Sequence, residues 1–445
     1  MRPVRRLLRI SAEPRLALAC ALVAPLWFIP GVAGLVLGGA GLAAVVVATI
    51  VDWMRLPGRE YLAVEREVPE SLGLGDETPI RYVVQSRWRR DVTVRIADEL
   101  PDALQGGATA SGTAVAVPAG AEVVVTLPVT GVRRGRFPLG RVGWRAHTPL
   151  GLLAAYWIGE SEHSVLVAPS VSGVRRFRLL AIQHRLHTAG VRALRRKGEG
   201  QSFAGLREYA VGDDPRHVDW KATARRNTLI TREYSIEQSQ TVLTLVDAGR
   251  GMTQLAGAYP RFEHALSSAL VLTDVAVAAG DRVGTLLFDD EVRAFVPPRR
   301  GRGALGAIRN ALIPVTATMT EPDYAAAFRY LAVHQRRRAL IVFFTDVIDV
   351  RASRALVAHV TRSAARHLVV IVALRNDALI ASALPSGRKA LDLYESAAAE
   401  ELISSRDEAL ERMRRAGATV LDVSPTGMTA AVVNRYLEIK GRGAL

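Results

Sequence analysis

Long uncharged stretches dominate the first part of the chain. No side chain from Leu16 to Val51 is charged, and Pro30-Gly31 divides this apolar run. The part after the division has the roughly 20 apolar residues that a helix needs to cross a bilayer, whereas the part before it is shorter. The pattern predicts two transmembrane helices joined by a tight turn, within an N-terminal segment of residues 1–58.

Arginines flank this apolar segment on both sides. They are Arg2, Arg5, Arg6, Arg9, Arg15, Arg55 and Arg59. Since basic flanks favour the cytoplasmic side, both ends of the hairpin are predicted to lie there, with the following domains in the cytoplasm. Two alternatives stay open. One is a cleaved signal peptide followed by secretion, and the other is a single span that places the rest of the chain outside.

Residues 59–170 contain short runs rich in Val, Ile, Thr and aromatic residues, separated by turn residues. The runs include PIRYVVQS, DVTVRIAD, AEVVVTLPV, RVGWRA and HSVLVAP. Such runs at regular spacing predict a small β-sandwich. They carry no cluster of His, Cys or Ser, so binding or spacing is the expected role of this domain.

From residue 241 onward, apolar strand patterns alternate with helical patterns. The strand runs include TVLTLVD, RVGTLLF, ALIVFFTD and HLVVIVAL. This alternation predicts an α/β doubly wound domain over residues 241–445, with a largely parallel sheet covered by helices on both faces. The chain as a whole is therefore predicted to be multidomain, and residues 171–240 form a connector between its β-sandwich and its α/β domain.

Charge is concentrated in that connector. The chain has a formal net charge of +15, and residues 171–240 carry 14 basic and 7 acidic side chains. Such a patch suits anionic lipid or an acidic protein. Nucleic acid is not expected, because the zinc-ligand spacings and basic strands interleaved with aromatic residues are absent from the sequence. The single cysteine, Cys20, excludes an intramolecular disulfide and fits a reducing compartment.

Two aspartates follow predicted parallel strands. Asp247 ends TVLTLVD, and Asp346 follows LIVFFT. Ligands of such sheets bind beyond the carboxyl ends of the strands, so neighbouring strands would bring both carboxylates into one crevice. Paired carboxylates favour a hard cation such as Mg²⁺ or Ca²⁺.

The densest charged stretch is LREYAVGDDPRHVDWKATARR, residues 206–226. Asp214 is placed to cap a helix that begins at Pro215. Arg216 and Asp219 are three residues apart and can pair on one helix face, and Trp220 offers apolar area for docking. Arg207, Tyr209 and Arg225 are expected to reach toward these acids.

His217 lies among these acids and raises the question of acid–base chemistry. No nucleophile or metal cluster accompanies it, and the phosphate-binding pattern G-x-x-x-x-G-K-[ST] is absent from the sequence. The chain is therefore predicted not to be an enzyme. The stretch is interpreted as an ion-pair brace between connector and α/β domain that can also shape a docking surface.

Taken together, these pieces resemble known families. DAGRGM after the first strand and FTDVID after a later one are similar to the von Willebrand factor A domain, which binds a divalent cation through an Asp-x-Ser-x-Ser motif, a threonine and a later aspartate. The whole chain resembles the bacterial family called domain of unknown function 58. The resemblance lies in the N-terminal hairpin, in VRRGRFPLG and TPLGL, and in Leu206-Arg207-x-Tyr209, Gly212-Asp213-Asp214-x-Arg216 and Asp219-Trp220-x-x-Thr223-Ala224-Arg225.

The cation motif of this chain departs from the A-domain pattern. Its two serine positions are Gly249 and Gly251, and the threonine position is assigned to Thr320. Two carboxylates and water would bind Mg²⁺ weakly. Alternatively, Arg250 in the same loop neutralises the carboxylates without a metal.

The family resemblance implies a membrane-anchored adaptor that works with a MoxR-type AAA+ ATPase, in complex assembly or envelope maintenance. Two other functions are kept as alternatives. One is a cation-dependent hydrolase that uses Asp247 and Asp346, and the other is an exported adhesion-type A domain.

Overall fold

The computed structural model describes residues 10–442 apart from several internal stretches. The omitted stretches are 108–111, 160–162, 171–201, 211–212, 236–239, 348–353 and 384–389, and only the backbone is described for 202–205, 233–235 and 390–392. The basic part of the predicted connector, residues 171–200, and Gly212 lie outside the described residues. The chain divides into two compact units, Met1–Ser170 and Val171–Leu445.

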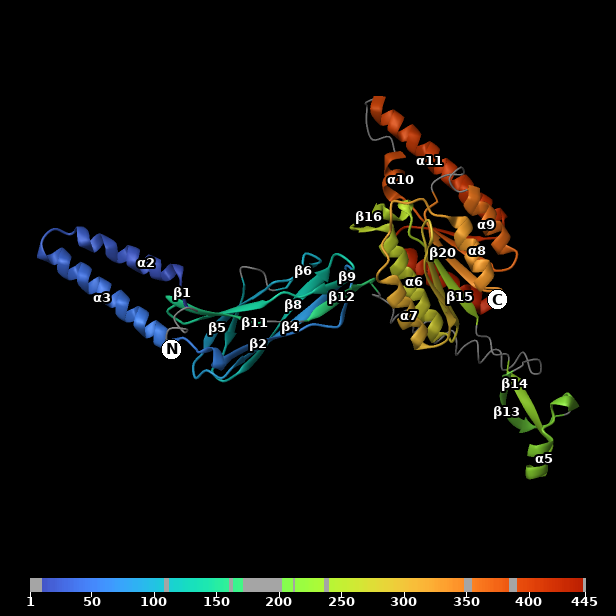
Figure 1. The fold of residues 1–445 in the computed structure, drawn as a ribbon, viewed down its shortest axis with the longest axis horizontal. Coiled ribbons are helices and arrows are strands. Elements are labelled where there is room, and N and C mark those ends of the chain that lie inside the picture. The colour runs from blue at the N-terminus through green and yellow to red at the C-terminus, as the bar shows by residue number, and fades with distance from the viewer. Residues whose placement is uncertain are drawn as a thin grey trace. The chain divides into compact units, whose positions relative to one another are not determined.

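The apolar N-terminal residues form helices (Figure 1). Helix α2 (Pro14–Val23) continues into the short 3₁₀ helix η1 (Ala24–Phe28), and α3 (Val32–Arg55) follows. Gly31 makes the turn with a φ of 83°, in the left-handed region that favours glycine. Among the described residues, α3 is the one helix long and apolar enough to cross a membrane. The segment before it is shorter than this measure requires, so the structure supports one candidate span and the second predicted span stays a prediction.

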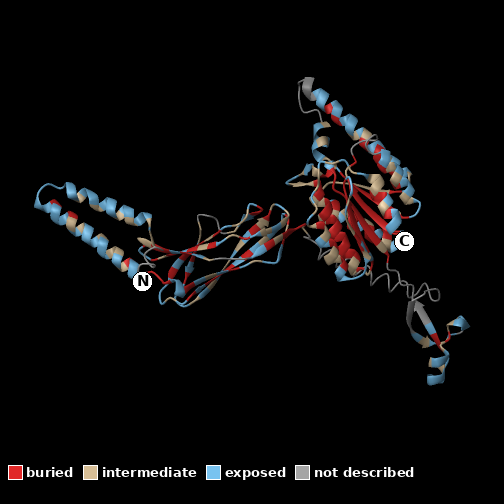
Figure 2. Cartoon of the chain, in the orientation of Figure 1, coloured by how far each residue is buried: buried red, intermediate tan, exposed pale blue. Residues whose placement is uncertain are grey.

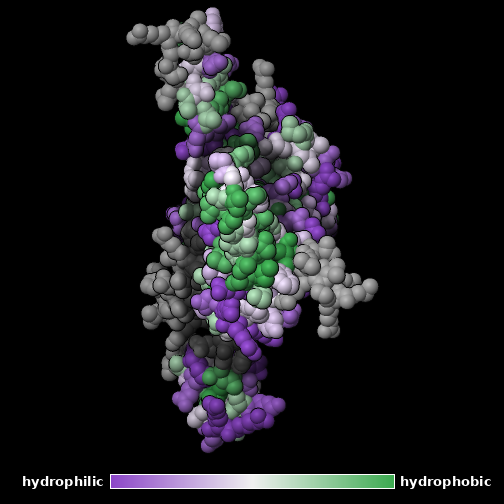
Figure 3. Space-filling view, turned by 90° about the vertical axis from the view of Figure 1, so that its left-hand side faces the viewer, coloured by the Kyte–Doolittle hydropathy of each residue, from purple (hydrophilic) through white to green (hydrophobic). Residues whose placement is uncertain are grey.

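Apolar side chains cover the outer surface of these helices (Figure 3). In α3, Gly34, Gly38 and Asp52 are the buried residues. Leu35 and Val47 are 64% and 60% exposed. A contiguous apolar surface of this kind is typical of a membrane or protein interaction site.

Three sheets make up the rest of the first unit. The five-stranded sheet has the order β1 (Ile10–Ala12), β11 (Leu153–Gly159), β10 (Val142–His147), β5 (Val92–Asp98) and β7 (Thr113–Val117). The four-stranded sheet has the order β2 (Leu62–Glu67), β4 (Glu77–Ser86), β8 (Glu122–Gly131) and β6 (Leu104–Gly106). The third contains β3 (Ser71–Gly73), β12 (Ser164–Ala168) and β9 (Gly135–Pro138). The prediction of a β-rich middle is confirmed.

A buried polar cluster joins the two larger sheets. Strand β5 alternates buried and exposed positions, and this alternation places the carboxylate of Asp98 among the inward-facing residues. Arg66 of β2 forms an ion pair with Asp98, and Tyr82 of β4 donates a hydrogen bond of 2.7 Å to it. Burial raises the pKa of Asp98, although the hydrogen bond from Tyr82 and the charge of Arg66 oppose the rise. These contacts show that the two sheets face each other across a shared core.

Residues 202–235 form a small hairpin module with an insertion. Strand β13 (Ser202–Glu208) pairs antiparallel with β14 (Ile230–Ser235). Between them lie the 3₁₀ helix η3 (Pro215–His217) and helix α5 (Trp220–Arg226). Because the ends of such short helices fray, the capping hydrogen bonds define where each helix begins.

The second unit contains a six-stranded sheet. Its order is β19 (Val292–Arg299), β18 (Arg282–Phe288), β15 (Thr241–Asp247), β20 (Leu340–Thr345), β21 (Leu368–Leu374) and β22 (Thr419–Val423). The five strands β18, β15, β20, β21 and β22 run parallel to one another, and β19 pairs antiparallel with β18 at one edge. Strands β15 and β20 are buried along nearly their whole length, as expected for a parallel sheet with both faces covered (Figure 2).

Helices cover both faces of this sheet. One face packs against α6 (Arg261–Ala278), α7 (Arg302–Leu312) and α12 (Met428–Arg442). The other packs against α8 (Tyr324–His334), α9 (Arg354–Ala364) and α11 (Ala390–Arg415). Alternate residues of one strand serve the two faces: Phe344 lies in the first cluster and Phe343 in the second. A further helix, α10 (Asp377–Ala383), and the short strands β16 (Leu255–Ala256) and β17 (Tyr259–Pro260) lie in connections.

Candidate functional site

The two predicted aspartates meet at the carboxyl edge of the sheet. Strands β15 and β20 are parallel neighbours, with Val246 opposite Phe344. Asp247 therefore ends one strand at the level where Asp346 follows the other. Both side chains are largely shielded from solvent, and the structure places them in one region as the strand pattern requires.

Asp247 is held by hydrogen bonds from three different segments. One carboxylate oxygen accepts from the amide of Gly249 at 2.7 Å. The other accepts from the hydroxyls of Thr345 at 2.7 Å and Tyr324 at 3.3 Å. Its ligand-binding capacity is thus used largely within the protein.

Burial dominates the electrostatics of this carboxylate. It raises the pKa of Asp247 to about 6, although the hydrogen bonds from Thr345 and Gly249 oppose the rise. Burial and the nearby charge of Asp247 also raise the pKa of Tyr324 well above its usual value. The phenol therefore stays protonated at neutral pH and can act as a hydrogen-bond donor.

An arginine that the sequence did not single out neutralises Asp346. Arg261, the first residue of α6, contacts Asp346 with a nitrogen–oxygen distance of 2.6 Å, and the two side chains are only 4% and 6% exposed. The helix dipole disfavours a cation at the start of a helix, and the ion pair with Asp346 offsets this cost. Burial raises the pKa of Asp346, and the charges of Arg261 and Arg406 oppose this rise.

The prediction that Arg250 neutralises the aspartates is wrong. Its guanidinium pairs with Glu321 at 2.6 Å, where both side chains are more than half exposed. Thr320, the assigned threonine, accepts the amide of Arg250 with its carbonyl and shares a 2.7 Å hydrogen bond with Thr318. Arg250 points to the loop of Glu321 because its own backbone is fixed by Thr320.

The two glycines of the loop lie directly against the aspartates. A Cβ at Gly249 would lie 3.1 Å from an oxygen of Asp247, and one at Gly251 would lie 3.2 Å from an oxygen of Asp346. The backbone therefore approaches both carboxylates closely but contributes no hydroxyl. No group of three or more His, Cys, Asp or Glu side chains arranged to hold a metal occurs among the described residues.

A third aspartate, Asp289, lies at this edge and was not predicted from the sequence. Asp289 follows β18 directly, as Asp346 follows β20. It accepts hydrogen bonds of 2.8 Å from Arg293 and 3.0 Å from Thr318. Its place after the run RVGTLLF was the signal that would have found it. Like the predicted pair, it already has partners within the protein.

The signature residues of the hairpin module are joined to one another. Arg207 contacts Asp213 at 2.6 Å, and the second oxygen of Asp213 accepts the amide of Ala210 at 2.9 Å. The hydroxyl of Tyr209 donates to the carbonyl of Asp213. Thr223 accepts the amide of Ile230, which closes α5 onto β14. These contacts brace the module internally, while a brace between it and the α/β domain stays a prediction.

Two aspartates cap the short helices of this module. Asp214 accepts the amide of Arg216 at 2.9 Å and precedes Pro215, as the sequence pattern indicated. Asp219 accepts the amide of Ala222 at 3.0 Å and so caps α5. That hydrogen bond, and then the one from Arg232, lower the pKa of Asp219.

The predicted pairing of Arg216 with Asp219 is not found. The free oxygen of Asp219 instead contacts Arg232 of β14 at 2.9 Å. The expected approach of Arg225 to the acids is also not found among the described contacts. The two residues of the predicted pair belong to different short helices, η3 and α5, so the three-residue spacing of a continuous helix does not apply.

Helix α5 and the preceding η3 carry an exposed aromatic residue and exposed cations. Trp220 is 70% exposed. Four basic residues of these two helices are also exposed, and within the described part of the chain they make no ion pair: Arg216, Lys221, Arg225 and Arg226. We call Trp220 and these four residues the outer face of the module.

A protein-family model described as "Protein of unknown function DUF58" matches residues 205–418. The match begins in β13 of the hairpin module and ends just before β22. It therefore includes both the outer face and the carboxyl edge of the sheet.

Similar proteins occur in mycobacteria. The chain is 26% identical over 185 residues to "Uncharacterized protein Mb1516" of Mycobacterium bovis and to "Uncharacterized protein Rv1480" of Mycobacterium tuberculosis. These alignments cover 39% of this chain and 55% of each relative, so the chain spans about half the length of these relatives. Among solved structures, the cupredoxin domain of amoB from Nitrosocaldus yellowstonii matches 25% of this chain and 89% of its own, with 12% identity and a TM-score of 0.19.

Proposed function

We propose that this protein is a non-enzymatic, membrane-anchored adaptor whose hairpin module docks a protein partner. The observation that carries the proposal is the outer face of the module. Trp220 is 70% exposed and belongs to the same two short helices as four exposed cations, while Asp213 and Asp219 of the module are engaged within it. Exposed tryptophan and arginine are the residue types that contribute most to protein interfaces.

The carboxyl edge of the sheet supports a non-catalytic role. Asp247 accepts three hydrogen bonds, and Asp346 is paired with a buried arginine. A hydrolase that used this pair would need at least one carboxylate available for a cation or a water molecule. The ion pair with Arg261 therefore disfavours the alternative of a cation-dependent hydrolase.

The family model matches residues 205–418, and we extend the family assignment to the residues outside this range. We place the whole chain in the DUF58 family and its α/β domain among the von Willebrand factor A type. The parallel sheet with one antiparallel edge strand, the aspartates after β15 and β20, and the resemblance of the N-terminal segments support this assignment.

The partner that we propose is a MoxR-type AAA+ ATPase, as the family resemblance implies. The two proteins would act in complex assembly or envelope maintenance. In the proposed topology the N-terminal helices cross the cytoplasmic membrane twice and the remaining domains lie in the cytoplasm. Protease treatment of intact and of lysed cells tests this topology. Cleavage of the C-terminal domain in intact cells would instead support an exported adhesion-type A domain.

Binding to a purified MoxR-type ATPase from the same host tests the adaptor role. The full-length protein is immobilised in uncharged detergent, and ATPase binding is measured by interferometry with and without nucleotide. Saturable binding supports the proposal. Absence of binding by folded protein, in both nucleotide states, would exclude this class of partner.

A further inference from the structure

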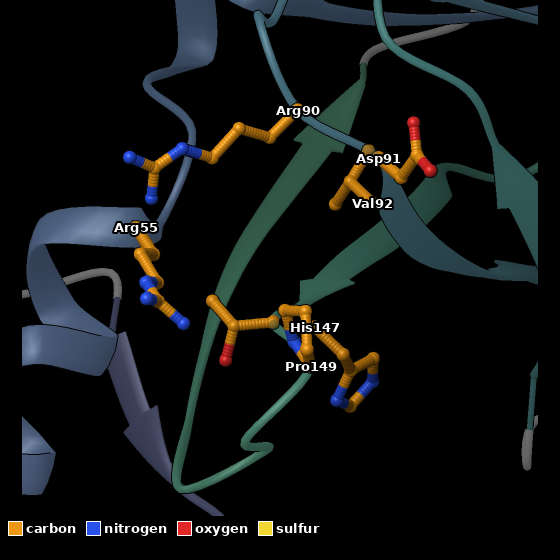
Figure 4. Close-up of a pocket in the computed structure, with 7 residues that line it drawn as sticks. Arg55, Arg90, Asp91, Val92, His147 and Pro149 are labelled. Carbon is orange, nitrogen blue, oxygen red and sulfur yellow. The ribbon is translucent and has the colours of Figure 1, made fainter.

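A cavity of about 210 Å³ lies where the apolar helix α3 meets the β-rich domain (Figure 4). It is formed by the last residue of α3, the connection between β4 and β5, and the end of β10 with the loop that follows. Its lining residues are Arg55, Arg90, Asp91, Val92, His147, Thr148 and Pro149. The cavity is smaller than the roughly 300 Å³ or more typical of drug-sized ligands, and it suits a compact polar group.

A buried carboxylate fixes the cavity wall to the helix. Asp52, in the last turn of α3, accepts the amides of Leu152 and Leu153 at 2.9 Å each and the hydroxyl of Thr148. Arg15 of α2 also reaches the carbonyl of Leu150 at 3.4 Å. The loop after β10 is therefore held against the base of α3, and the cavity is preformed.

Two arginines line this cavity. The guanidinium groups of Arg55 and Arg90 form no hydrogen bond or ion pair within the described part of the chain, and Figure 4 shows them on the same side of the cavity. The one acidic lining residue, Asp91, directs its carboxylate away from them and accepts the amide of Ala119 at 2.9 Å. The local field thus favours an anion.

One residue of the wall, His147, directs its imidazole to the side opposite the two guanidinium groups (Figure 4). Nε2 of His147 is buried and has no hydrogen-bond partner among the residues that the structure describes. Burial lowers the pKa of His147, and nearby arginines lower it further, although Glu13 raises it. The imidazole is therefore neutral at neutral pH, and the two arginines set the preference of the cavity for an anion.

The position of the cavity along the chain identifies the class of anion. Arg55 ends a helix of 24 residues whose apolar side chains are mostly exposed, and Trp53 beside it is 40% exposed. Aromatic and basic residues at the end of an apolar helix are typical of the membrane–water interface, where lipid phosphates lie. Anionic lipids attract basic residues at this level.

From these observations we propose that the cavity binds the phosphate of an anionic phospholipid headgroup. Arg55 and Arg90 donate hydrogen bonds to the phosphate oxygens and neutralise their charge, while His147 and Thr148 belong to the cavity wall. This site rests on the membrane anchorage of the proposed function and is independent of the protein partner. It would make the folded first unit sensitive to the composition of its membrane.

Native mass spectrometry of the full-length protein in uncharged detergent tests the site. The protein is titrated with short-chain phosphatidylglycerol, with phosphatidylcholine of the same chain length, and with inorganic phosphate. The test variant is Arg55→Gln with Arg90→Gln. The matched control is Arg81→Gln with Arg136→Gln, which removes the same charge from strand positions of the same unit that lie away from the cavity. We expect preferential binding of phosphatidylglycerol, weakened about fivefold for each cavity arginine removed.

Retained preference in the test variant, or an equal loss in the control, would overturn the site in favour of diffuse attraction. Inorganic phosphate that displaces the lipid would overturn the lipid as its source. Flotation with neutral phosphatidylcholine vesicles separates this result from the anchorage itself. If the protein floats with these vesicles but shows no headgroup preference by mass spectrometry, only the site is overturned. If the protein fails to float, the anchorage and the lipid source are overturned together.

Discussion

The carboxyl edge of the sheet and the outer face of the hairpin module treat charge in opposite ways. At the edge, Asp247 and Asp346 are shielded from solvent and bonded to Thr345, Tyr324 and Arg261. On the outer face, four cations and Trp220 are exposed with no partner in the described part of the chain. Both regions contain the residue types that sequence motifs assign to function.

This difference separates residues that stabilise the fold from residues that are available to bind a partner. A buried ion pair costs desolvation and persists only with good geometry, so breaking one partner is expensive. Exposed charges cost little in the free protein and can be matched by a partner. The edge is therefore expected to govern stability, and the outer face to govern binding.

Removal of Arg261 should have the largest effect. Arg261→Met leaves Asp346 buried without its cation and is expected to lower the free energy of unfolding by about 3–5 kcal/mol. Hydrogen exchange of the β20 amides measures this, because all six tryptophans precede residue 241 and do not report on the α/β domain. The double variant Arg261→Met with Asp346→Leu should recover most of the loss. Equal losses in both variants would show that packing, rather than the unpaired charge, sets the effect.

Asp247 should give the α/β domain an unusual pH dependence. Its pKa is raised from 3.8 to about 6 in the folded protein, so the folded state binds the proton more tightly than the unfolded state. Its contribution to stability is present below the unfolded pKa and is lost as pH rises toward about 6, by roughly 3 kcal/mol. Urea unfolding followed by circular dichroism should show a steeper decline in the native protein than in Asp247→Asn, because the other carboxylates contribute equally to both curves. Equal slopes in the native protein and the variant would contradict the assignment.

Trp220 should dominate binding without affecting the fold. Trp220→Ala is expected to weaken capture of the protein partner by about 30-fold, the effect of losing a central interface residue worth roughly 2 kcal/mol. The control is Tyr394→Ala, because Tyr394 is 75% exposed on α11. Interferometry measures both variants beside thermal unfolding. Comparable weakening in the control would move the interface away from the module.

The cations of the outer face should act mainly on association rate. Arg225→Gln with Arg226→Gln is expected to reduce the association rate up to about tenfold at low salt, with little change at high salt. Arg414→Gln with Arg415→Gln, at the exposed end of α11, removes the same charge elsewhere and should have a smaller effect. A rate that is insensitive to salt in the native protein would remove the electrostatic part of the comparison.

Divalent cations should have the smallest effect. Because Arg261 already neutralises Asp346, and Gly249 and Gly251 supply no hydroxyl ligands, Mg²⁺ is expected to leave thermal unfolding unchanged. Scanning calorimetry with added Mg²⁺ and with chelator checks this directly. Stabilisation that grows with Mg²⁺ concentration would mean that the edge binds the cation despite the arginine.

Local patterns in the sequence determined the elements of this protein and several of their contacts. The continuous apolar run of β15 and the alternation in β5 follow from burial on two faces or on one. The cap of η3 by Asp214 was predictable, because donor and acceptor are two residues apart. The apolar length of α3 follows in the same way from composition alone.

Only the tertiary structure decided which charges neutralise one another. The sequence offered Arg250 as an alternative to a metal for neutralising the two carboxylates, and Arg216 as the partner of Asp219, since these residues are close along the chain or share a predicted motif. The fold instead brings Arg261 and Arg232 to these acids. Parallel strands bring segments that are distant in sequence to the same edge of the sheet, and this places Arg261 beside Asp346. In the hairpin module, strand β14 lies beside the insertion that carries Asp219, and this places Arg232 beside that carboxylate. Periodicity specifies which side of an element is buried, but the partner of a buried charge depends on how the elements pack.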